Sequence, residues 1–571
     1  MFFYWLLTTE VKQTSRMSSS GSLPNILGIS GGEHDAAAAL LQGTELRAAL
    51  EEEKLVRVRR ARGLPFRAIR YCLEAGGLEP GQIDYVALAR PLHAESGERG
   101  MGESWLPKQL KQEFPAAKMV VFDHHLCHAA AAYFPSPFEQ AAVLTLDENG
   151  DLKTGSLLLA RGNTLESLED SYFPDSLGNL FSRVAGLLGF AAGVDEHKLQ
   201  WLSTCGNPVY APVFRTILHH DGNSLLSVDQ SFFAAGRNDR GGFAEKFFAA
   251  AGMDPAAPLS EPCRADLAAS VQEVLEETLL EVCRRLVSRH PVETLCLAGG
   301  VALNTLLVEK LETSGLFREI FVQPAAGNAG NALGAGLYCA HALLGLSPRS
   351  RLEHLYYGPE YSTADIKDVL ENCKLSFRYL QTREEIIAAA VEVLRADHIL
   401  GWFQGRTEFG PRALGARSIL ASPLGPYVND NLNSYVKHRE KFRPFAASVT
   451  QERASEFFEY GPMAGFLASV GRVKPAYRDT FSSNLLPGRP REGEERGDAA
   501  RIRVHVVSRK TNPLFWELLE AFGRATGLPV LFNTSFNLFG EPLVCSPRDA
   551  VRSFFCSGLD HLILSNFLLS K

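Results

Sequence analysis

Two histidines and an aspartate are the residues of this sequence whose types and spacing best fit metal binding. His124 and His128 lie four residues apart in the stretch HHLCHAAAAY, whose alanines favour an α-helix. Residues at positions i and i+4 share one face of a helix, so both imidazoles can reach one ion. Asp147 follows an apolar run at 141–146 that predicts a buried strand. Together these side chains predict a metal site with mixed nitrogen and oxygen ligands.

Two glycines follow Asp147 closely. Gly150 and Gly155 allow the backbone to turn tightly around a phosphate group, which makes phosphate a second candidate ligand. Each signal also has an ordinary structural explanation, because a helical histidine pair often serves packing and an acid before a glycine often forms a plain turn. Their occurrence in one segment favours a metal or phosphate site, since convergent functional groups are harder to explain by chance.

A second concentration of charge lies in the C-terminal half. The segments 405–418 and 437–444 contain arginines among glycine, proline and apolar residues, a pattern that a solvated charged helix would not show. Arginine presents a planar fork of donors that matches a phosphate or a carboxylate. Predicted strands at 501–506 and 529–532 bring further polar residues. The two basic segments therefore predict a ligand that bears phosphate.

Composition narrows the class of protein. The chain has 571 residues, enough for two or three domains, and its apolar content of 46% is typical of a globular protein. Its net charge of −7 gives no overall attraction to nucleic acid or to an anionic membrane. An apolar stretch at 2–7 is far too short to span a bilayer. Ten scattered cysteines without a C-x-x-C pair predict reduced thiols and a cytoplasmic location.

The N-terminal half repeats one local design. The segments 25–35 and 141–151 each combine an apolar strand, a glycine turn that carries an acid, and a returning strand. This pattern resembles a duplicated actin- or hexokinase-like ATPase architecture, in which ligand binds in the cleft between the halves. A predicted strand at 294–297 then runs into Gly299 and Gly300, whose amides can approach a phosphate, and Asn304 follows them.

The expected fold is therefore α/β and α+β. We expect a disordered extension at 1–24, a duplicated actin/hexokinase-like domain at 25–346, a linker at 347–363 and a separate C-terminal domain at 364–571. Apolar residues at helical spacing predict a long amphipathic helix at 264–289.

Several motifs, in this order, resemble the NodU/CmcH/TobZ-type carbamoyltransferase family. They begin with His34-Asp35 and Glu53 and continue as HHLCHAA, LTLD, AGGVALN, EFGPRALGARSIL, KHREKFRPFA and FNTSFNLFGEPLV. The likeness extends from about Ile26 to the C-terminus. Members of this family join an actin-like domain, similar to the tRNA threonylcarbamoyl transferase, to a C-terminal domain similar to YrdC.

The resemblance implies an ATP-dependent O-carbamoyltransferase. The C-terminal domain would make carbamoyl adenylate from carbamoyl phosphate and ATP, with Mg²⁺ accompanying the ATP. The N-terminal domain would transfer the carbamoyl group to a hydroxyl of a small molecule, such as a secondary metabolite or a sugar. No residue identifies the acceptor, and the sequence does not determine the oligomeric state, so a homodimer is one of the open alternatives.

The resemblance also implies roles for particular residues. The transfer site would hold iron or a similar divalent metal through His124, His128, Asp147 and Asn328, the last in the place of a family aspartate. The implied catalytic residues are His34, Asp35 and Glu53. His34 would act as a base toward the acceptor hydroxyl, or else be a structural turn residue. The nucleotide in the N-terminal domain would be held by Gly150, Gly299, Gly300 and Asn304. In the C-terminal domain, carbamoyl phosphate and ATP would be neutralised by Arg412, Arg417, Lys437, Arg443 and Arg503 and positioned by Ser535 and Asn537.

Trp201 marks a departure from the family pattern. The family usually has small residues around this position, and a bulky indole is expected to reshape the adenylate or acceptor cleft. A degenerate, non-catalytic nucleotide-binding homologue would fit both Trp201 and Asn328. An actin-like small-molecule kinase would explain the glycine turns but not the histidine pair. A hydrogenase-maturation carbamoyltransferase would carry C-x-x-C pairs, which this sequence lacks.

Overall fold

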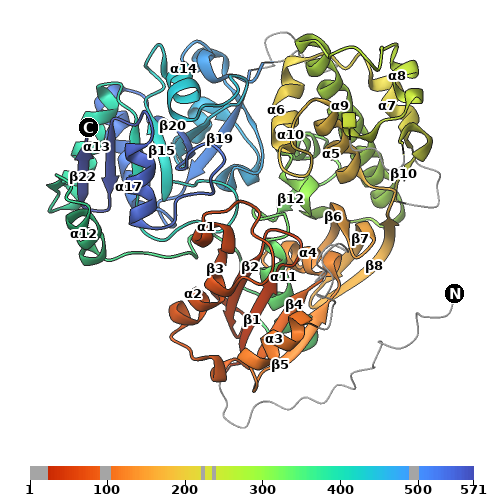
Figure 1. Cartoon of the computed structure of the whole chain (residues 1–571), viewed down its shortest axis with the longest axis horizontal. Coiled ribbons are helices and arrows are strands. Elements are labelled where there is room, and N and C mark those ends of the chain that lie inside the picture. Colours follow the sequence, from red (N-terminus) through yellow and green to blue (C-terminus); the bar gives the residue numbers. More distant parts are fainter. Residues whose placement is uncertain (1–22, 91–104, 220–224, 235–238, 488–499) are drawn as a thin grey trace.

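The computed structural model describes residues 23–90, 105–219, 225–234, 239–487 and 500–571. Figure 1 shows an N-terminal domain with two sheets and a lobe of helices, next to a C-terminal domain with one large sheet. Most of the predicted disordered extension at 1–24 lies outside the described residues. Within those residues, no helix is both long enough and apolar enough to cross a membrane.

The first sheet of the N-terminal domain is built around strand β1. In the described part of the chain its strand order is β3-β2-β1-β4-β5, with β1 antiparallel to β2 and parallel to β4. Its strands are β1 (Asn25–Ser30), β2 (Ala37–Gln42), β3 (Glu45–Glu51), β4 (Tyr85–Ala89) and β5 (Lys118–Phe122). The same half contains helices α1 (Glu52–Val56), α2 (Phe66–Gly76) and α3 (Trp105–Glu113).

The second sheet repeats the topology of the first. Its order is β8-β7-β6-β11-β12 among the described strands, with β6 antiparallel to β7 and parallel to β11. Its strands are β6 (Gln140–Gly150), β7 (Lys153–Arg161), β8 (Thr164–Tyr172), β11 (Thr294–Ala298) and β12 (Glu319–Val322). Each sheet thus has an antiparallel meander on one side of its first strand and two parallel strands on the other. The predicted duplicated architecture is confirmed.

Helices α4 (His124–Tyr133) and α11 (Gly330–Tyr338) join the two sheets. Helix α11 packs on β1 and β4, α4 packs on β6 and β11, and the two helices contact each other. This approach requires glycine: a Cβ on Gly28 would lie 2.0 Å from a carbonyl oxygen of α11, and one on Gly334 would lie 1.9 Å from a carbonyl oxygen of α4. The small residues therefore hold α4, with its two histidines, tightly in the core.

A lobe of helices is inserted between β8 and β11, at the upper right of Figure 1. Its longest helix, α9 (Glu261–Arg289), confirms the helix predicted at 264–289. It begins earlier because the Ser260 side chain caps it by accepting a hydrogen bond from the Cys263 amide. The other elements of the lobe and its surroundings are α5 (Leu177–Leu187), α6 (Glu196–Leu202), α7 (Ala211–Ile217), β9 (Leu218–His219), β10 (Ser227–Val228), α8 (Glu245–Ala251) and α10 (Thr305–Glu312).

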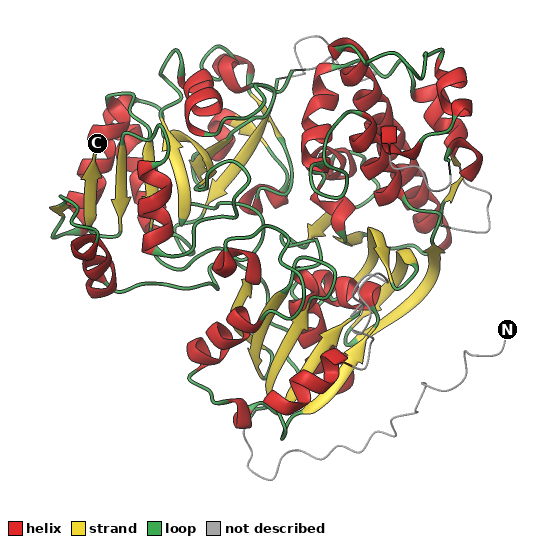
Figure 2. Ribbon diagram, in the orientation of Figure 1, coloured by secondary structure: helices red, strands yellow, loops and turns green. Residues whose placement is uncertain are grey.

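The C-terminal domain is built on one mixed sheet flanked by helices, as Figure 2 shows. Within the described residues, the order is β13-β22-β21-β14-β15-β20-β16-β19-β18-β17. The strands are β13 (Arg378–Tyr379), β14 (Leu400–Phe403), β15 (Arg417–Ala421), β16 (Ala446–Thr450), β17 (Phe458–Glu459), β18 (Gly471–Val473), β19 (Arg501–Val507), β20 (Val530–Ser535), β21 (His561–Leu564) and β22 (Phe567–Ser570). The helices are α12 (Thr363–Asn372), α13 (Arg383–Arg395), α14 (Val428–Asp430), α15 (Ala454–Phe457), α16 (Pro513–Thr526) and α17 (Pro547–Phe555).

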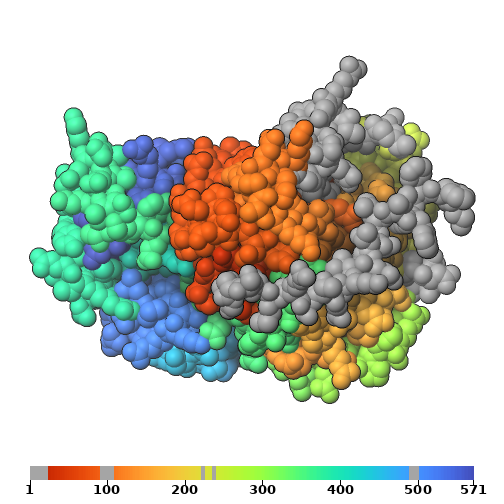
Figure 3. Space-filling view, turned by 90° about the horizontal axis from the view of Figure 1, so that it is seen from below, coloured from red at the N-terminus to blue at the C-terminus, as the bar shows by residue number. Residues whose placement is uncertain are grey.

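The segment predicted as a linker packs against both domains. The Leu352 amide donates to the Pro135 carbonyl oxygen at 2.9 Å, and the Gly358 amide donates to the Thr407 carbonyl oxygen at 2.8 Å. Leu355, which lies between Leu352 and Gly358 in the sequence, is buried. Figure 3 shows the first half of the N-terminal domain, in red and orange, directly against the C-terminal domain in green and blue. The two domains are therefore held in one arrangement by packing rather than by a free spacer.

Candidate metal centre and anion site

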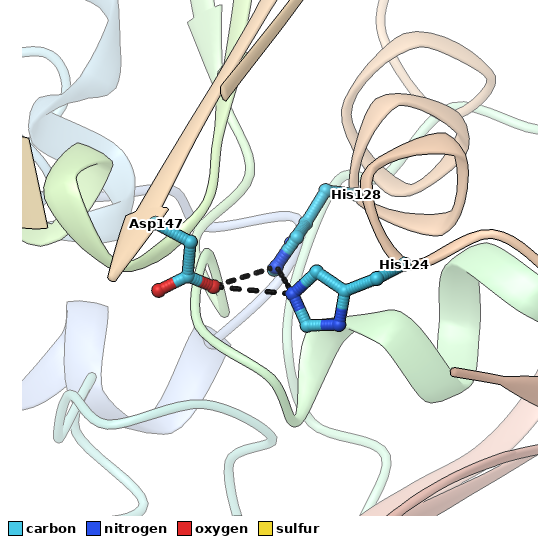
Figure 4. A group of neighbouring side chains, drawn as sticks. All are labelled: His124, His128 and Asp147. Atoms are coloured by element: carbon cyan, nitrogen blue, oxygen red, sulfur yellow. Dashed lines mark hydrogen bonds and ion pairs between the residues drawn. The ribbon is translucent and has the colours of Figure 1, made fainter. Parts of the chain in front are cut away.

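The predicted metal ligands His124, His128 and Asp147 meet in the structure. The two histidines lie one turn apart on α4, and the Asp123 side chain caps that helix by accepting from the Leu126 amide at 3.1 Å. Asp147 lies in β6, where the pairing with β7 is irregular between Leu146 and Gly150. Figure 4 shows both imidazoles directed at the Asp147 carboxylate. Asp147 Oδ2 is 3.3 Å from His124 Nε2 and 3.1 Å from His128 Nε2, and the two Nε2 atoms are 3.1 Å apart.

These distances fit a shared metal ion. His124 Nδ1 lies 2.7 Å from the Arg90 carbonyl oxygen, which only accepts, so Nδ1 carries the proton of the neutral ring. In the neutral ring His124 Nε2 directs a lone pair at the carboxylate, and either a second ring proton, which makes Nε2 a hydrogen-bond donor, or a metal ion between the two groups removes the repulsion. Ligand atoms about 2.0–2.1 Å from a tetrahedral metal lie about 3.3 Å apart. The three side chains, whose ligand atoms lie within 4.8 Å of one another, therefore suit a divalent metal.

The electrostatics of the site keep Asp147 charged. Burial alone would raise the pKa of Asp147, but the hydrogen bonds from His124 and His128 hold it well below its ordinary value. Burial lowers the pKa of His128. For His124 burial acts in the same direction, but the hydrogen bond and charge of Asp147 outweigh it and raise the pKa. A charged carboxylate and imidazole nitrogens are a donor set that divalent metals accept.

Gly150 makes room for His124 instead of forming a turn. Strand β6 continues through Gly150, and the chain reverses at Asp151 and Leu152, whose φ angles are 55° and 71°. A Cβ on Gly150 would lie 2.2 Å from His124 Cδ2. The prediction that Gly150 turns around a phosphate is therefore wrong, because the residue lies in the strand and packs under the imidazole.

The predicted fourth ligand, Asn328, lies beside His34. Asn328 Nδ2 is 3.3 Å from His34 Nδ1, whereas Asn331 Nδ2 is 3.4 Å from His124 Nδ1. The amide that contacts a predicted metal ligand is thus Asn331, which the sequence reasoning missed. The Oδ1 atoms of both asparagines are buried without a hydrogen-bond partner among the described residues. Coordination by Asn328 stays a prediction.

The three predicted catalytic residues form a second group. His34 Nδ1 lies 2.8 Å from Asp35 Oδ2, and Asp35 adopts a left-handed backbone with φ 54°. Glu53 accepts a hydrogen bond from the Arg60 amide at 2.9 Å, and burial raises the pKa of Glu53, with a further contribution from Asp35. With Asp35 accepting from Nδ1, the remaining ring nitrogen, Nε2, is the one that can take a proton, and it lies 3.4 Å from Asn328 Nδ2.

The glycine-rich segment after β11 approaches Asp147. A Cβ on Gly299 would lie 2.1 Å from the Leu146 carbonyl oxygen, and one on Gly300 would lie 2.9 Å from Asp147 Oδ1. Asn304 does not contribute to a ligand site in the predicted way. Its Oδ1 caps α10 by accepting from the Leu307 amide, and its side chain exchanges hydrogen bonds with Gln272. The side chain is buried, and these hydrogen bonds to Leu307 and Gln272 give it a structural role.

Three of the predicted residues of the C-terminal domain form one group. Lys437 is 5% exposed and donates to the carbonyl oxygens of Ser535 at 2.8 Å and of Asn537 at 2.9 Å. Ser535 Oγ in turn donates to Asn537 Oδ1 at 2.8 Å. Burial, followed by the charges of Arg439 and Arg443, lowers the pKa of Lys437 well below its ordinary value.

Next to this group lies a cluster of arginines that we call the arginine cluster: Arg412, Arg439, Arg443 and Arg503. Burial and then the charges of the other three lower the pKa of Arg503 well below its ordinary value. Burial and the charge of Arg443 lower the pKa of Arg412 to about 10. Arg503 Nε and Nη2 are buried without a hydrogen-bond partner among the described residues. Cations that are partly removed from water and repel one another favour the binding of an anion.

Arg417 lies outside the arginine cluster, contrary to the prediction. It is fully buried at the start of β15, and its guanidinium donates to the carbonyl oxygens of Gln404 and Gly405 at 2.8 and 2.9 Å. Its Cζ atom lies 3.5 Å from the ring centroid of Phe403. All of these partners belong to the protein, so Arg417 stabilises the fold.

Sequence reasoning missed two members of the C-terminal site. Arg439 lies within the KHREKFRP stretch, and the concentration of basic residues in that stretch is the signal that could have identified it. His197 comes from α6 of the N-terminal domain, and no local pattern connects it to the arginines. Burial and then the charges of Arg443 and Arg59 lower the pKa of His197 well below its ordinary value. The site is thus lined by both domains.

Comparison with known proteins places this geometry in a family. A family model of the carbamoyltransferase N-terminus matches residues 25–96 and 90–337, and a model of the carbamoyltransferase C-terminus matches residues 391–571. An uncharacterized protein of Synechocystis is 34% identical over 96% of this chain and 97% of its own length. Nodulation protein NolNO of Sinorhizobium fredii is 34% identical over 94% of this chain and 79% of its own. Nodulation protein NolO of Bradyrhizobium diazoefficiens is 36% identical over 79% of each chain.

Among solved structures, HypF of T. kodakarensis aligns with a TM-score of 0.34 and 15% identity, over 57% of this chain and 49% of that one, and so low a score supports no argument. The two family models, in contrast, cover both domains described above. This chain belongs to the carbamoyltransferase family.

Proposed function

We propose that this carbamoyltransferase makes carbamoyl adenylate from carbamoyl phosphate and ATP in its C-terminal domain and transfers the carbamoyl group to a hydroxyl of a small molecule in its N-terminal domain. The arginine cluster is the observation that carries the proposal. Two buried nitrogens of Arg503 have no hydrogen-bond partner among the described residues, and Arg412, Arg439 and Arg443 repel its charge. Carbamoyl phosphate and ATP are multiply charged anions whose oxygens fit guanidinium donors.

The first half-reaction balances with one water molecule. Water releases phosphate from carbamoyl phosphate and leaves carbamate, and a carbamate oxygen then attacks the α-phosphorus of ATP. Pyrophosphate leaves, and the new C–O–P linkage is carbamoyl adenylate. The arginine cluster supports this step because it neutralises charge on phosphate, pyrophosphate and ATP, and Mg²⁺ accompanies the ATP.

The second half-reaction requires a base for the acceptor hydroxyl and a carbamoyl carbon that is positioned for attack by that hydroxyl. The acceptor hydroxyl attacks the carbamoyl carbon, its proton leaves to a base, and AMP is expelled. His34 is suited to take the proton at Nε2, because Asp35 accepts from its Nδ1. The acceptor hydroxyl would replace the Asn328 amide, which lies 3.4 Å from Nε2. Its side chain is 28% exposed, so an acceptor can reach it. Burial, with the charges of Glu51 and Asp35, raises the pKa of Glu53 next to this pair.

His124, His128 and Asp147 would hold a divalent metal, which we propose to be Fe²⁺. When bound, this ion supplies a Lewis acid for an oxygen of the carbamoyl group or of the adenylate phosphate. Metal analysis of the purified protein tests the assignment. The double variant His124→Ala, His128→Ala should lose the metal, and wild-type metal content in that variant would contradict the ligand set.

The division of labour is tested by two single variants. Arg503→Ala should abolish the carbamoyl phosphate-dependent exchange of pyrophosphate into ATP, because it removes a buried cation from the first site. His128→Ala should retain this exchange and lose acceptor-dependent AMP release with a panel of hydroxylated small molecules. Arg509 provides a matched control. It is exposed and lies two residues after the end of β19, so Arg509→Ala removes a nearby arginine that is not part of the arginine cluster. If His128→Ala abolished exchange as completely as Arg503→Ala, the two-site proposal would be wrong.

A further inference from the structure

An indole of the N-terminal domain lies against the arginine cluster of the C-terminal domain. Trp201 is in the last turn of α6 and is 3% exposed. The Cζ atom of Arg503 lies over its ring, 5.6 Å from the centroid. Figure 1 shows α6 on the side of the helical lobe that faces β19, the strand that carries Arg503. A cation within about 6 Å of an indole face is attracted by the electron density of the ring.

Helix α6 is fixed on both sides of this contact. Gln200, next to Trp201, donates a hydrogen bond to Thr305 Oγ1 at 2.7 Å within the N-terminal domain. Lys198 forms an ion pair with Glu440 of the C-terminal domain at 3.2 Å, and Glu440 lies 3.7 Å from Arg443. The helix that presents the indole is therefore tied to the loop that carries another member of the arginine cluster.

Apolar packing holds the ring itself. Trp201 forms a small buried cluster with Leu306 of α10 and with Val470 and Leu486 of the C-terminal domain, and Phe442 packs against it. A large aromatic ring in such a setting has little freedom to reorient. Its face toward Arg503 is thus a fixed surface contributed by the neighbouring domain.

Arg503 needs such a surface. Its Nε and Nη2 atoms have no hydrogen-bond partner among the described residues, and the charges nearest to it are those of other arginines. Repulsion from these neighbours favours conformations in which the guanidinium turns away. Attraction to the face of the indole restrains the guanidinium and leaves its donors available for phosphate oxygens.

We propose that Trp201 is a positioning residue, whose indole holds the Arg503 guanidinium in the orientation that receives phosphate groups and so completes the anion site of the C-terminal domain from the N-terminal domain. The identity of the phosphate compounds rests on the proposed function. The effect of Trp201 on the affinity for a polyphosphate anion does not rest on it, because this effect follows from the contact between Trp201 and Arg503. The indole thereby couples donor binding to the arrangement of the two domains.

Calorimetric titration of the full chain with inorganic pyrophosphate tests the role. Trp201→Leu keeps an apolar side chain but removes the aromatic face, and it should weaken pyrophosphate binding roughly 5- to 30-fold, as expected for a partly desolvated cation–π contact. Trp201→Phe keeps an aromatic face and should bind within about 3-fold of the wild type. Leu370→Ala, on α12 in the core of the C-terminal domain and outside the Trp201 cluster, is the control for lost packing and should leave affinity nearly unchanged.

Two results would overturn the inference: wild-type affinity in Trp201→Leu, or an equal loss of affinity in Trp201→Phe and Trp201→Leu.

If Trp201→Leu fails to fold, site-specific replacement of Trp201 by tetrafluorotryptophan preserves the shape of the side chain while withdrawing electron density from the ring. Reduced pyrophosphate affinity is then expected, and unchanged affinity overturns the role. A chain that binds pyrophosphate in this Trp201-dependent way without forming carbamoyl adenylate would support the inference while contradicting the proposed function. A wild-type chain that does not bind pyrophosphate would overturn both.

Discussion

Lys54 of the N-terminal domain donates a hydrogen bond to the Glu408 carbonyl oxygen of the C-terminal domain at 2.6 Å. The same ammonium reaches the Gly410 carbonyl oxygen at 2.9 Å and forms an ion pair with Glu51 at 2.8 Å. Glu51 in turn accepts from the Gly410 amide at 2.7 Å. Lys54 is 1% exposed, so this pair of opposite charges joins the domains in a buried setting. The contact fixes the EFGPR loop that leads into Arg412.

Lys54→Met should destabilise the domain interface by about 3–5 kcal/mol, because it leaves Glu51 buried without its partner. Urea unfolding followed by tryptophan fluorescence measures the loss. Arg47→Met is the control: Arg47 pairs with Glu45 at the surface, and an exposed pair contributes at most about 1 kcal/mol. Equal midpoints for the two variants would contradict the importance of the buried pair.

A second interface group predicts a pH dependence. Glu312 of α10 accepts hydrogen bonds from Ser469 Oγ and from the Met463 amide of the C-terminal domain. Burial, together with the charge of Glu309, raises the pKa of Glu312 from 4.5 to about 7. The folded protein therefore binds a proton that the unfolded chain has already released. This contribution to stability is present below pH 4.5, declines as pH rises, and is lost above about 7.

The full pKa shift of Glu312 corresponds to a free energy of unfolding that is roughly 3 kcal/mol larger below pH 4.5 than well above pH 7. Glu312→Gln should abolish it, because an amide mimics the neutral carboxyl group at every pH. The measurement is the difference in unfolding free energy between wild type and Glu312→Gln at pH 5 and at pH 8, in which other titrating groups cancel. A difference that does not change with pH would show that Glu312 titrates as an ordinary surface acid.

Gly150→Ala should weaken metal binding without altering a ligand. The added Cβ would lie 2.2 Å from His124 Cδ2, so the imidazole must move away from Asp147. Changes around metal ligands typically lower affinity about 10- to 100-fold. Competition with a chelator measures the effect. Gly81→Ala is the control, since its Cβ would meet no atom within 4 Å. Wild-type affinity in Gly150→Ala would contradict the observed packing of His124.

The predictable parts of this protein are those encoded locally. The spacing of His124 and His128 places them on one helical face, and the apolar strand before Asp147 brings the carboxylate to the core. The duplicated topology followed from two matching strand–turn–strand segments. Asn304 also carried a local signal that was overlooked, because an asparagine before a helical apolar run is a typical N-cap.

The remaining parts depend on contacts between distant segments. Arg417 and Arg412 look alike in a basic stretch, but β15 is paired between β14 and β20, which places Arg417 inside the domain. The contact between Trp201 and Arg503 joins residues about 300 positions apart. No periodicity or spacing encodes such a contact, because it arises from the packing of two domains.

The last prediction separates Asn328, the predicted fourth ligand beside His34, from Asn331, which contacts His124. Asn328 has an Nδ2 atom beside His34 and a buried Oδ1 atom with no hydrogen-bond partner in the described part of the chain, whereas Asn331 has its Nδ2 atom 3.4 Å from His124 Nδ1. If Asn328 Oδ1 completes the metal site, Asn328→Asp adds a negative charge to a partly desolvated cation, and metal affinity should rise at least about tenfold. Asn331→Asp places its charge beside Nδ1 of His124 instead. There it favours the protonated imidazole, which cannot bind a metal, so affinity should stay equal or fall. Both variants and the wild type are compared without nucleotide, at one pH and one salt concentration. Equal or weaker metal binding by Asn328→Asp would remove Asn328 from the ligand set, and tighter binding by Asn331→Asp would assign the fourth position to Asn331.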